Sequence, residues 1–223
     1  MITPKPYQSI PILESGEPLV SIPEQLARTS PHIYRALGAP YGDRSPFLLR
    51  AGVVTRLMQA QTQLQAVEPG WRIQIFDGYR PVPVQQFMVE YTFRQLLGER
   101  DPQTLSAAEL EALYARVYQF WAPPSLDPPP PHSTGGAVDV MLVDAIGQEV
   151  PMGSPIDEVS ERSFPDYFAQ QDARFHHHRQ QLFKSMTQAG FERHPNEWWH
   201  FCWGDQLWAW LGGHPHAHYG RVD

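Results

Sequence analysis

The sequence predicts a single α+β domain in which a mainly antiparallel sheet is packed by helices. Helical patterns come first in the chain, and hairpin-like strands lie between and after them, without the strand–helix–strand alternation of a parallel sheet. At 223 residues the chain suits one compact domain whose core can enclose a polar site. We therefore expect one unit over residues 1–223, with a proline-rich loop at 122–131 and a flexible tail from about residue 212.

Apolar residues at helical spacing predict the first long helix. The pattern consists of Leu49, Val53, Leu57, Leu64 and Val67. The sequence Glu68-Pro69-Gly70 ends this helix. The alternating segment WRIQIF (71–76) then predicts a strand with Ile73 and Ile75 on one face.

Two further helices are predicted before the middle of the chain. Pro81 and Pro83 suit a loop that leads into a helix ending at about Leu97. Ser106-Ala-Ala-Glu109 is a capping-box pattern before a helix that ends near Trp121. Proline fixes φ and lacks an amide donor, so the proline-rich segment that follows is expected to be extended polyproline.

The second half of the chain contains most of the predicted strands. The expected elements are a strand at 137–142, a turn at 144–147, a short return strand at 148–150, a helix at 174–189 and an aromatic strand at 198–203. Gly190 supplies a stop for the helix. Alternation in the first of these strands places Asp139 on the face opposite its apolar neighbours.

Composition excludes several classes of protein. A formal net charge of −7 gives no basic excess for binding nucleic acid. Cys202 is the only cysteine, so no intrachain disulfide can form. No segment approaches the roughly 20 apolar residues of a membrane span, and the opening residues do not resemble a secretory signal. We therefore expect a cytoplasmic protein that binds neither nucleic acid nor membrane.

His132 and Asp139 are candidate metal ligands. They flank the sequence Ser-Thr-Gly-Gly, and the glycines let a loop histidine and a strand carboxylate converge. Zinc accepts both donor types, and catalytic zinc sites use three protein ligands plus water. Taken alone, the pair also fits a loop histidine and a solvated or turn-capping aspartate.

Glu197 and His200 extend this pattern. A Pro-Asn turn precedes them and an aromatic run surrounds them, which favours a loop entering a strand. Glu197 would then overhang a metal held by His200. Alternatively, His200 is a hydrogen-bonded polar residue in an aromatic core strand. A polar pair in so apolar a segment is costly unless it has a partner, and a metal ion is a good one.

Arg80 follows the predicted strand at 71–76 in the sequence DGYRP (77–81). A guanidinium is permanently charged and rich in donors, so it can hold the negative oxygen that develops on an attacked carbonyl. A lone arginine is more often exposed or paired in a salt bridge. Two histidine groups, His176-His177-His178 and the tail residues His214, His216 and His218, are interpreted as exposed.

Together these motifs resemble the D-alanyl-D-alanine dipeptidase family of zinc peptidases. The segments that carry the resemblance, in the family's order from about Gln8 to Trp203, are DGYRPVPVQ, HSTGGAVDVML, VPMGS-x-x-D (150–157), MTQAGF (186–191) and EWWHF. The resemblance implies one zinc ion per chain on His132, Asp139 and His200, at the sheet. It also implies Glu197 as catalytic base, Arg80 as electrophilic helper and Asp157 as the group that binds the substrate's ammonium end.

The implied reaction is hydrolysis of a small dipeptide, D-Ala-D-Ala in the first place. One departure bears on specificity: the family's serine two residues before the first ligand, whose hydroxyl reaches the substrate, is Pro130 here. Two alternatives stay open. They are a cell-wall D,D-carboxypeptidase or endopeptidase with the same zinc core, and a non-catalytic zinc-binding module like the hedgehog signalling domain. The sequence indicates neither the oligomeric state nor the choice among zinc, cobalt and nickel.

Overall fold

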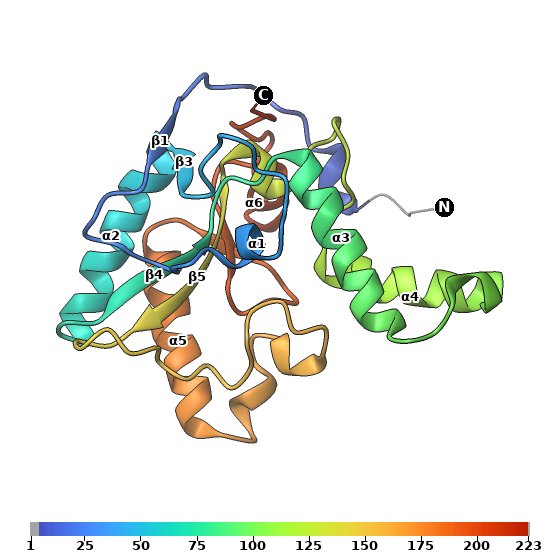
Figure 1. Cartoon of the computed structure of the whole chain (residues 1–223). Helices are drawn as coiled ribbons and strands as arrows, with labels where there is room; N and C mark the ends of the chain where they lie inside the picture. The colour runs from blue at the N-terminus through green and yellow to red at the C-terminus, as the bar shows by residue number, and fades with distance from the viewer. Residues whose placement is uncertain (1–4, 223) are drawn as a thin grey trace.

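The computed structural model describes residues 5–222, and a five-stranded sheet lies at its centre (Figure 1). Its strands, in spatial order, are β2 (Ala27–Arg28), β4 (Arg72–Asp77), β5 (Ala137–Val143), β7 (His200–Cys202) and β6 (Glu192–Arg193). The β2–β4 pair is parallel and the other three pairs are antiparallel. A separate antiparallel pair joins β1 (Leu19–Ser21) to β3 (Leu48–Arg50). The predicted single α+β domain with a mainly antiparallel sheet is confirmed.

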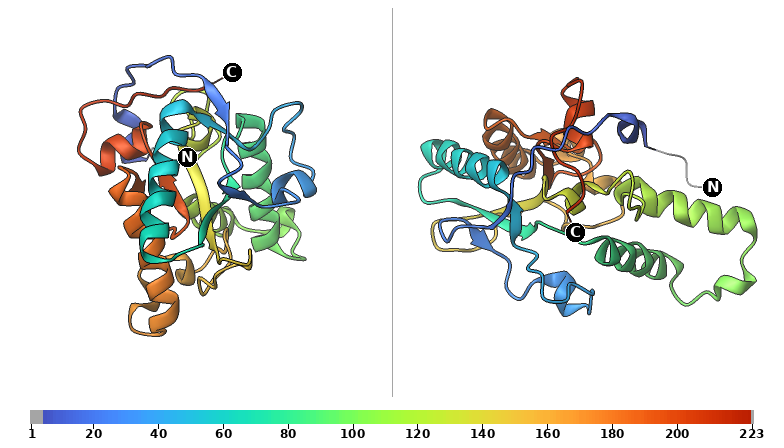
Figure 2. Two further views of the ribbon diagram at one scale, coloured as in Figure 1. Left: turned by 90° about the vertical axis from the view of Figure 1, so that its left-hand side faces the viewer. Right: turned by 90° about the horizontal axis from the view of Figure 1, so that it is seen from above.

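Two long helices cover one face of the sheet, and a pair of helices projects from the other side of the molecule. The helices are α1 (Ile33–Ala36), α2 (Ala51–Val67), α3 (Val82–Leu97), α4 (Ala107–Phe120), α5 (Ala173–Gln188) and α6 (Gln206–Leu211). Apolar residues of α2 and α5 pack with those of β4 and β5 in the main core. Helices α3 and α4 extend side by side away from the sheet (Figure 2).

Local sequence signals explain where the long helices begin and end. The Ser106 hydroxyl accepts a hydrogen bond from the Glu109 amide, and the Glu109 carboxylate accepts one from the Ser106 amide, so the predicted capping box of α4 is present. Asp172 caps α5 through the amides of Arg174 and Phe175. Gly190, with φ of 93°, follows the last turn of α5 and stops it as predicted.

Two predicted strands are shorter than expected. The prediction of an aromatic strand at 198–203 is wrong for Trp198 and Trp199, because regular strand pairing begins only at His200. Trp198 and Trp199 precede it as buried core residues that contact each other edge to face. The return strand at 148–150 is reduced to one antiparallel bridge between Val143 and Glu149.

The chain end differs from the expected flexible tail. Ala217 forms a parallel bridge with Ile12, and Tyr219 is fully buried in the main core. The Val222 amide donates to the carbonyl of Ser133 at 3.0 Å, beside the loop that carries a candidate metal ligand. Residues 217–222 are therefore packed against the domain. Over residues 5–222, no helix combines the length and apolar character needed to cross a membrane.

Candidate active site

Three segments bring the predicted metal ligands together. Asp139 on β5 lies directly opposite His200 on β7 in the antiparallel register. His132 lies in a short 3-10 helix, η3 (Pro131–Thr134), that leads into β5. The connection passes through Gly135, whose φ of 72° and close approach to Leu19 leave no room for a side chain. The glycines were thus correctly interpreted as the feature that lets loop and strand converge.

A β-bulge shapes the neighbouring strand. Ile75 pairs with Val140, but Asp77 pairs with Asp139, so β4 contains one extra residue at this point. Simple alternation would place Asp77 in the core with Ile75. The bulge instead turns its carboxylate to the site, where it accepts a hydrogen bond from Arg80 Nε at 2.8 Å.

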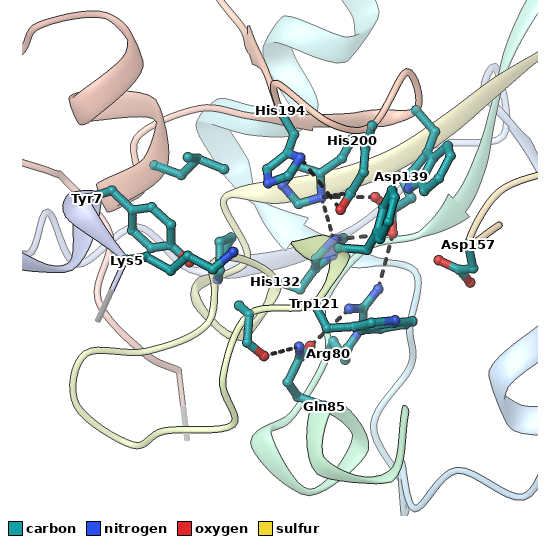
Figure 3. A pocket seen from close by; sticks show the side chains of 16 residues that line it. Lys5, Tyr7, Arg80, Gln85, Trp121, His132, Asp139, Asp157, His194 and His200 are labelled. Atoms are coloured by element: carbon teal, nitrogen blue, oxygen red, sulfur yellow. Dashed lines mark hydrogen bonds and ion pairs between the residues drawn. The ribbon is translucent and has the colours of Figure 1, made fainter. Parts of the chain in front are cut away.

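The side chains of the three candidate ligands converge on one point (Figure 3). His132 Nε2 lies 3.2 Å from His200 Nδ1 and 3.3 Å from Asp139 Oδ2, while His200 Nδ1 lies 3.1 Å from Asp139 Oδ1. Two ligands each about 2.0–2.1 Å from a tetrahedral ion lie roughly 3.3 Å apart. The observed spacing therefore fits one zinc-sized cation, and these residues are the possible metal site of the described chain.

The protonation of the three residues also suits a metal. His132 Nδ1 lies 2.7 Å from the carbonyl of Gly78, so it carries the proton and leaves Nε2 free to ligate. Burial lowers the pKa of His200 and keeps this imidazole neutral. Burial alone would raise the pKa of Asp139, but the charges and hydrogen bonds of the two histidines hold it well below its usual range. The set therefore offers one imidazole nitrogen from each histidine and a carboxylate.

Glu197 lies beside this set, where the sequence predicted it. Its Oε2 is 3.7 Å from His200 Nδ1, and its Oε1 is 3.6 Å from His194 Nδ1. Among residues 5–222, this buried Oε1 has no hydrogen-bond partner. Burial raises the pKa of Glu197 well above its usual value, as do the charges of Asp139 and Asp157. A raised pKa makes a carboxyl group a better proton acceptor than an exposed glutamate.

Arg80 is buried and forms ion pairs with Asp77 and Asp139, so it is not the exposed arginine that a lone motif would allow. Its Nη1 donates to Gln85 at 2.9 Å, and its Nη2 donates to Asp139 Oδ2 at 3.1 Å. The guanidinium also lies over the rings of Tyr34 and Trp121, 5.0 Å from each ring centroid. Burial alone would lower the pKa of Arg80, but Asp77 and the other neighbouring anions raise it, so the side chain stays a cation beside the metal ligands.

Asp157 faces the same cavity from the loop after β5. Its carboxylate accepts a hydrogen bond from the Tyr34 hydroxyl at 2.7 Å. Its φ of 66° makes it the only residue other than glycine with positive φ over the part of the chain described, a strain typical of functional sites. Burial and the charge of Asp139 raise the pKa of Asp157 to about 7. Arg179 on α5 fixes this loop by donating to the Met152 carbonyl at 2.7 Å.

All six predicted site residues line one narrow cavity of about 40 Å³. The proline-rich loop contributes Ala122 and Pro131 to its wall. Residues missed by the sequence analysis also contribute to the site; they are Lys5, Tyr7, Tyr34, Asp77, Gln85, Trp121 and His194. Asp77 and Gln85 lie within the motif DGYRPVPVQ (77–85) and His194 lies three residues before Glu197, but the other four had no local signal.

The fold and this constellation of ligands, carboxyl group and guanidinium define a metallopeptidase. A family model described as D-Ala-D-Ala dipeptidase, within a larger peptidase family, matches residues 27–218. A D-alanyl-D-alanine dipeptidase of Synechocystis sp. is 46% identical over 241 aligned residues, covering 98% of this chain and 97% of the relative. The chain belongs to the D-alanyl-D-alanine dipeptidase family, whose members hydrolyse dipeptides. The resemblance predicted from the sequence motifs is confirmed.

Proposed function

We propose that this protein hydrolyses D-Ala-D-Ala with one zinc ion per chain, held by His132, Asp139 and His200. The observation that carries the proposal is the convergence of these three side chains, whose nearest donor atoms lie 3.1–3.3 Å apart, with the unpartnered Oε1 of Glu197 beside them. The ligand atoms face one another, and the buried Oε1 of Glu197 has no hydrogen-bond partner, so their grouping around one point supports a bound cation and a bound water there.

When bound, zinc would polarise the substrate carbonyl and lower the pKa of an attacking water towards about 7. In this proposal Glu197 accepts a proton from that water and orients it towards the carbonyl carbon. Arg80 donates to the carbonyl oxygen as negative charge develops on it. Glu197 then donates the proton to the departing amine, which prevents the amide bond from forming again.

The amino end of the dipeptide would be recognised by Asp157. Its carboxylate, half-buried and fixed by Tyr34, suits the free ammonium group of a dipeptide. A peptide blocked at this end would cover Asp157 without giving it a counter-charge. The site would therefore reject N-acylated chains, as a dipeptidase must.

The two alternative functions have less support. A carboxypeptidase or endopeptidase needs an open cleft for a long chain, whereas this cavity is narrow and walled by the N-terminal segment and the proline-rich loop. A binding-only module has no need for a base or for an oxyanion partner, yet Glu197 and Arg80 both face the ligand set. The cytoplasmic location expected from the sequence stays a prediction.

A direct test measures amine release from dipeptides by purified protein. We expect D-Ala-D-Ala to be cleaved, chelator to abolish the activity and added zinc to restore it, with one equivalent of metal per chain by elemental analysis. Parallel reactions with L,D- and L,L-dipeptides and with an N-acylated D-Ala-D-Ala peptide define specificity. Cleavage of the acylated peptide but not the dipeptide would favour the carboxypeptidase. Zinc binding without cleavage of any peptide would favour the binding module.

A further inference from the structure

A dipeptide has two charged ends, and Asp157 is proposed to bind only one of them, the ammonium group. The C-terminal carboxylate needs a cation or several hydrogen-bond donors once it enters a narrow cavity. Two permanently basic side chains line this cavity, Arg80 and Lys5. Arg80 already has a proposed role at the scissile carbonyl, and its guanidinium also donates to Asp77, Gln85 and Asp139.

Lys5 is not committed in this way. Its ammonium group donates to the Tyr118 carbonyl at 2.5 Å and has two further N–H donors. Over residues 5–222 it forms no ion pair with a carboxylate. The side chain is half-buried in the cavity wall beside Tyr7, on the N-terminal segment of the chain. A cation in such a wall is stabilised when an anion binds next to it.

The two ends of the cavity carry opposite charges. Figure 3 shows Lys5 on one side of His132, Asp139 and His200, and Asp157 on the other. In a dipeptide the scissile carbonyl lies between the ammonium and the carboxylate. A substrate whose ammonium reaches Asp157 and whose carbonyl reaches the metal ligands therefore directs its carboxylate towards Lys5.

We propose that Lys5 binds the C-terminal carboxylate of the dipeptide and thereby selects substrates with a free carboxyl end. The inference rests on the proposed function, because it takes its direction from Asp157 and the metal ligands. Pro130, two residues before His132, has no hydroxyl or amide hydrogen to offer the carboxylate, so a donor for it must come from elsewhere in the chain. Burial lowers the pKa of Lys5, and an adjacent substrate carboxylate would raise it again.

A purely structural role is the competing explanation, since the bond from Lys5 to Tyr118 also fixes the N-terminal segment on α4. The test compares Lys5→Met and Lys5→Arg with Lys184→Met, a matched control at the exposed second lysine of the chain. Each protein is assayed with D-Ala-D-Ala and with its C-terminal carboxamide, which keeps the shape but not the charge. Melting temperature and metal content are measured for every variant.

We expect the parent enzyme to prefer the free acid over the carboxamide by about 10- to 100-fold in kcat/KM, the range of one charge-assisted hydrogen bond. Lys5→Met should lose that preference through a higher KM for the acid, while its kcat/KM for the carboxamide stays within about twofold. Lys5→Arg should retain most of the preference, and Lys184→Met all of it.

Two outcomes would overturn the inference while leaving the proposed function intact. One is equal cleavage of acid and carboxamide by the parent enzyme. The other is a Lys5→Met variant that keeps the full preference, or that loses activity on both substrates alike, as a structural role would produce. Failure of the parent enzyme to cleave any dipeptide with zinc present would instead reject the proposed function.

Discussion

The two faces of strand β5 are equally buried but chemically opposite. On one face, Val138, Val140 and Leu142 pack against α2 and α5, and their side chains are fully enclosed by apolar neighbours. On the other face, Asp139 is 2% exposed, yet it contacts two histidines and an arginine. Burial alone therefore does not separate core from site. The polar partners of each side chain, and the atoms left without one, make the distinction.

We expect the two faces of β5 to contribute to different properties, the apolar face to stability and the polar face to turnover. Apolar packing stabilises the fold, since each buried side chain removes apolar surface from water. A buried cluster of charges contributes little net stability, because desolvation offsets the attraction between them. Changes on the apolar face should therefore reduce stability at constant turnover. Changes on the polar face should reduce turnover in protein that still folds.

The largest effect on turnover is expected for Glu197→Gln. The amide cannot accept the proton of the attacking water, so kcat should fall about 10²- to 10⁴-fold while zinc stays bound. The exposed residue Glu161 provides a matched control, and Glu161→Gln should leave kcat unchanged. Steady-state rates are compared per equivalent of metal. Unchanged turnover in Glu197→Gln would remove this residue from the mechanism.

The next largest effect is expected for Arg80→Ala. Loss of one oxyanion partner typically lowers kcat about 10²- to 10³-fold, and kcat should change more than KM. The substitution also leaves Asp77 buried without its cation, which should destabilise the fold by about 3–5 kcal/mol. Rates must therefore be measured per folded, metal-loaded molecule. Arg80→Lys keeps the charge but not the planar set of donors and should be intermediate. A change confined to KM would make Arg80 a binding residue only.

The sequence predicted much of the fold because many of its signals are local. The capping box at Ser106 and Glu109 and the glycine stop at Gly190 act within one turn of a helix. Strand alternation likewise placed Asp139 opposite the apolar face of β5. The missed features depend on partners far along the chain. The bulge that turns Asp77 towards the site is visible only once β4 is aligned with β5.

The candidate site likewise combines residues with a local sequence signal and residues that depend on distant parts of the chain. The metal ligands, Glu197, Arg80 and Asp157 lie in short motifs whose residue types match their chemistry. Tyr34, which donates to Asp157, and Lys5, which lines the cavity and donates to Tyr118, lie in segments with no such motif, 123 and 113 residues from these partners. The sequence therefore identified the proposed chemical groups but not the side chains that hold them or that complete the cavity.

A smaller, pH-dependent effect is expected for Asp157→Asn. The parent carboxylate has a pKa of about 7, so KM for D-Ala-D-Ala should rise as pH falls below 7, where the group becomes neutral and no longer attracts the ammonium. The variant should show a KM about 10- to 100-fold higher at pH 8 and no such dependence. Measurements of KM between pH 6 and 8.5 test this. An identical pH profile in both proteins would reject Asp157 as the ammonium site.

The same group should affect stability with the opposite pH dependence. Its pKa is raised from the ordinary 3.8 to about 7 on folding, so the folded state holds a proton that the unfolded state has released between these values. The free energy of unfolding should therefore fall, for this group, as pH rises from about 4 to 7. Relative to Asp157→Asn, the parent protein should lose stability over that window in urea unfolding. A parent protein that gained stability over the window would contradict the raised pKa.

The smallest effect on turnover is expected on the apolar face, for Leu142→Ala. This side chain is fully buried, so the cavity left behind should reduce stability by about 2–5 kcal/mol. For a domain of this size, that loss should lower the melting temperature by roughly 4–20 °C, as measured by thermal unfolding. Per folded, metal-loaded molecule, kcat should stay within about twofold of the parent, because the polar face of β5 keeps its register with β7. If Leu142→Ala lowered kcat as strongly as Glu197→Gln without releasing zinc, the two faces would be mechanically coupled. Their division into a stabilising and a catalytic side would then be wrong.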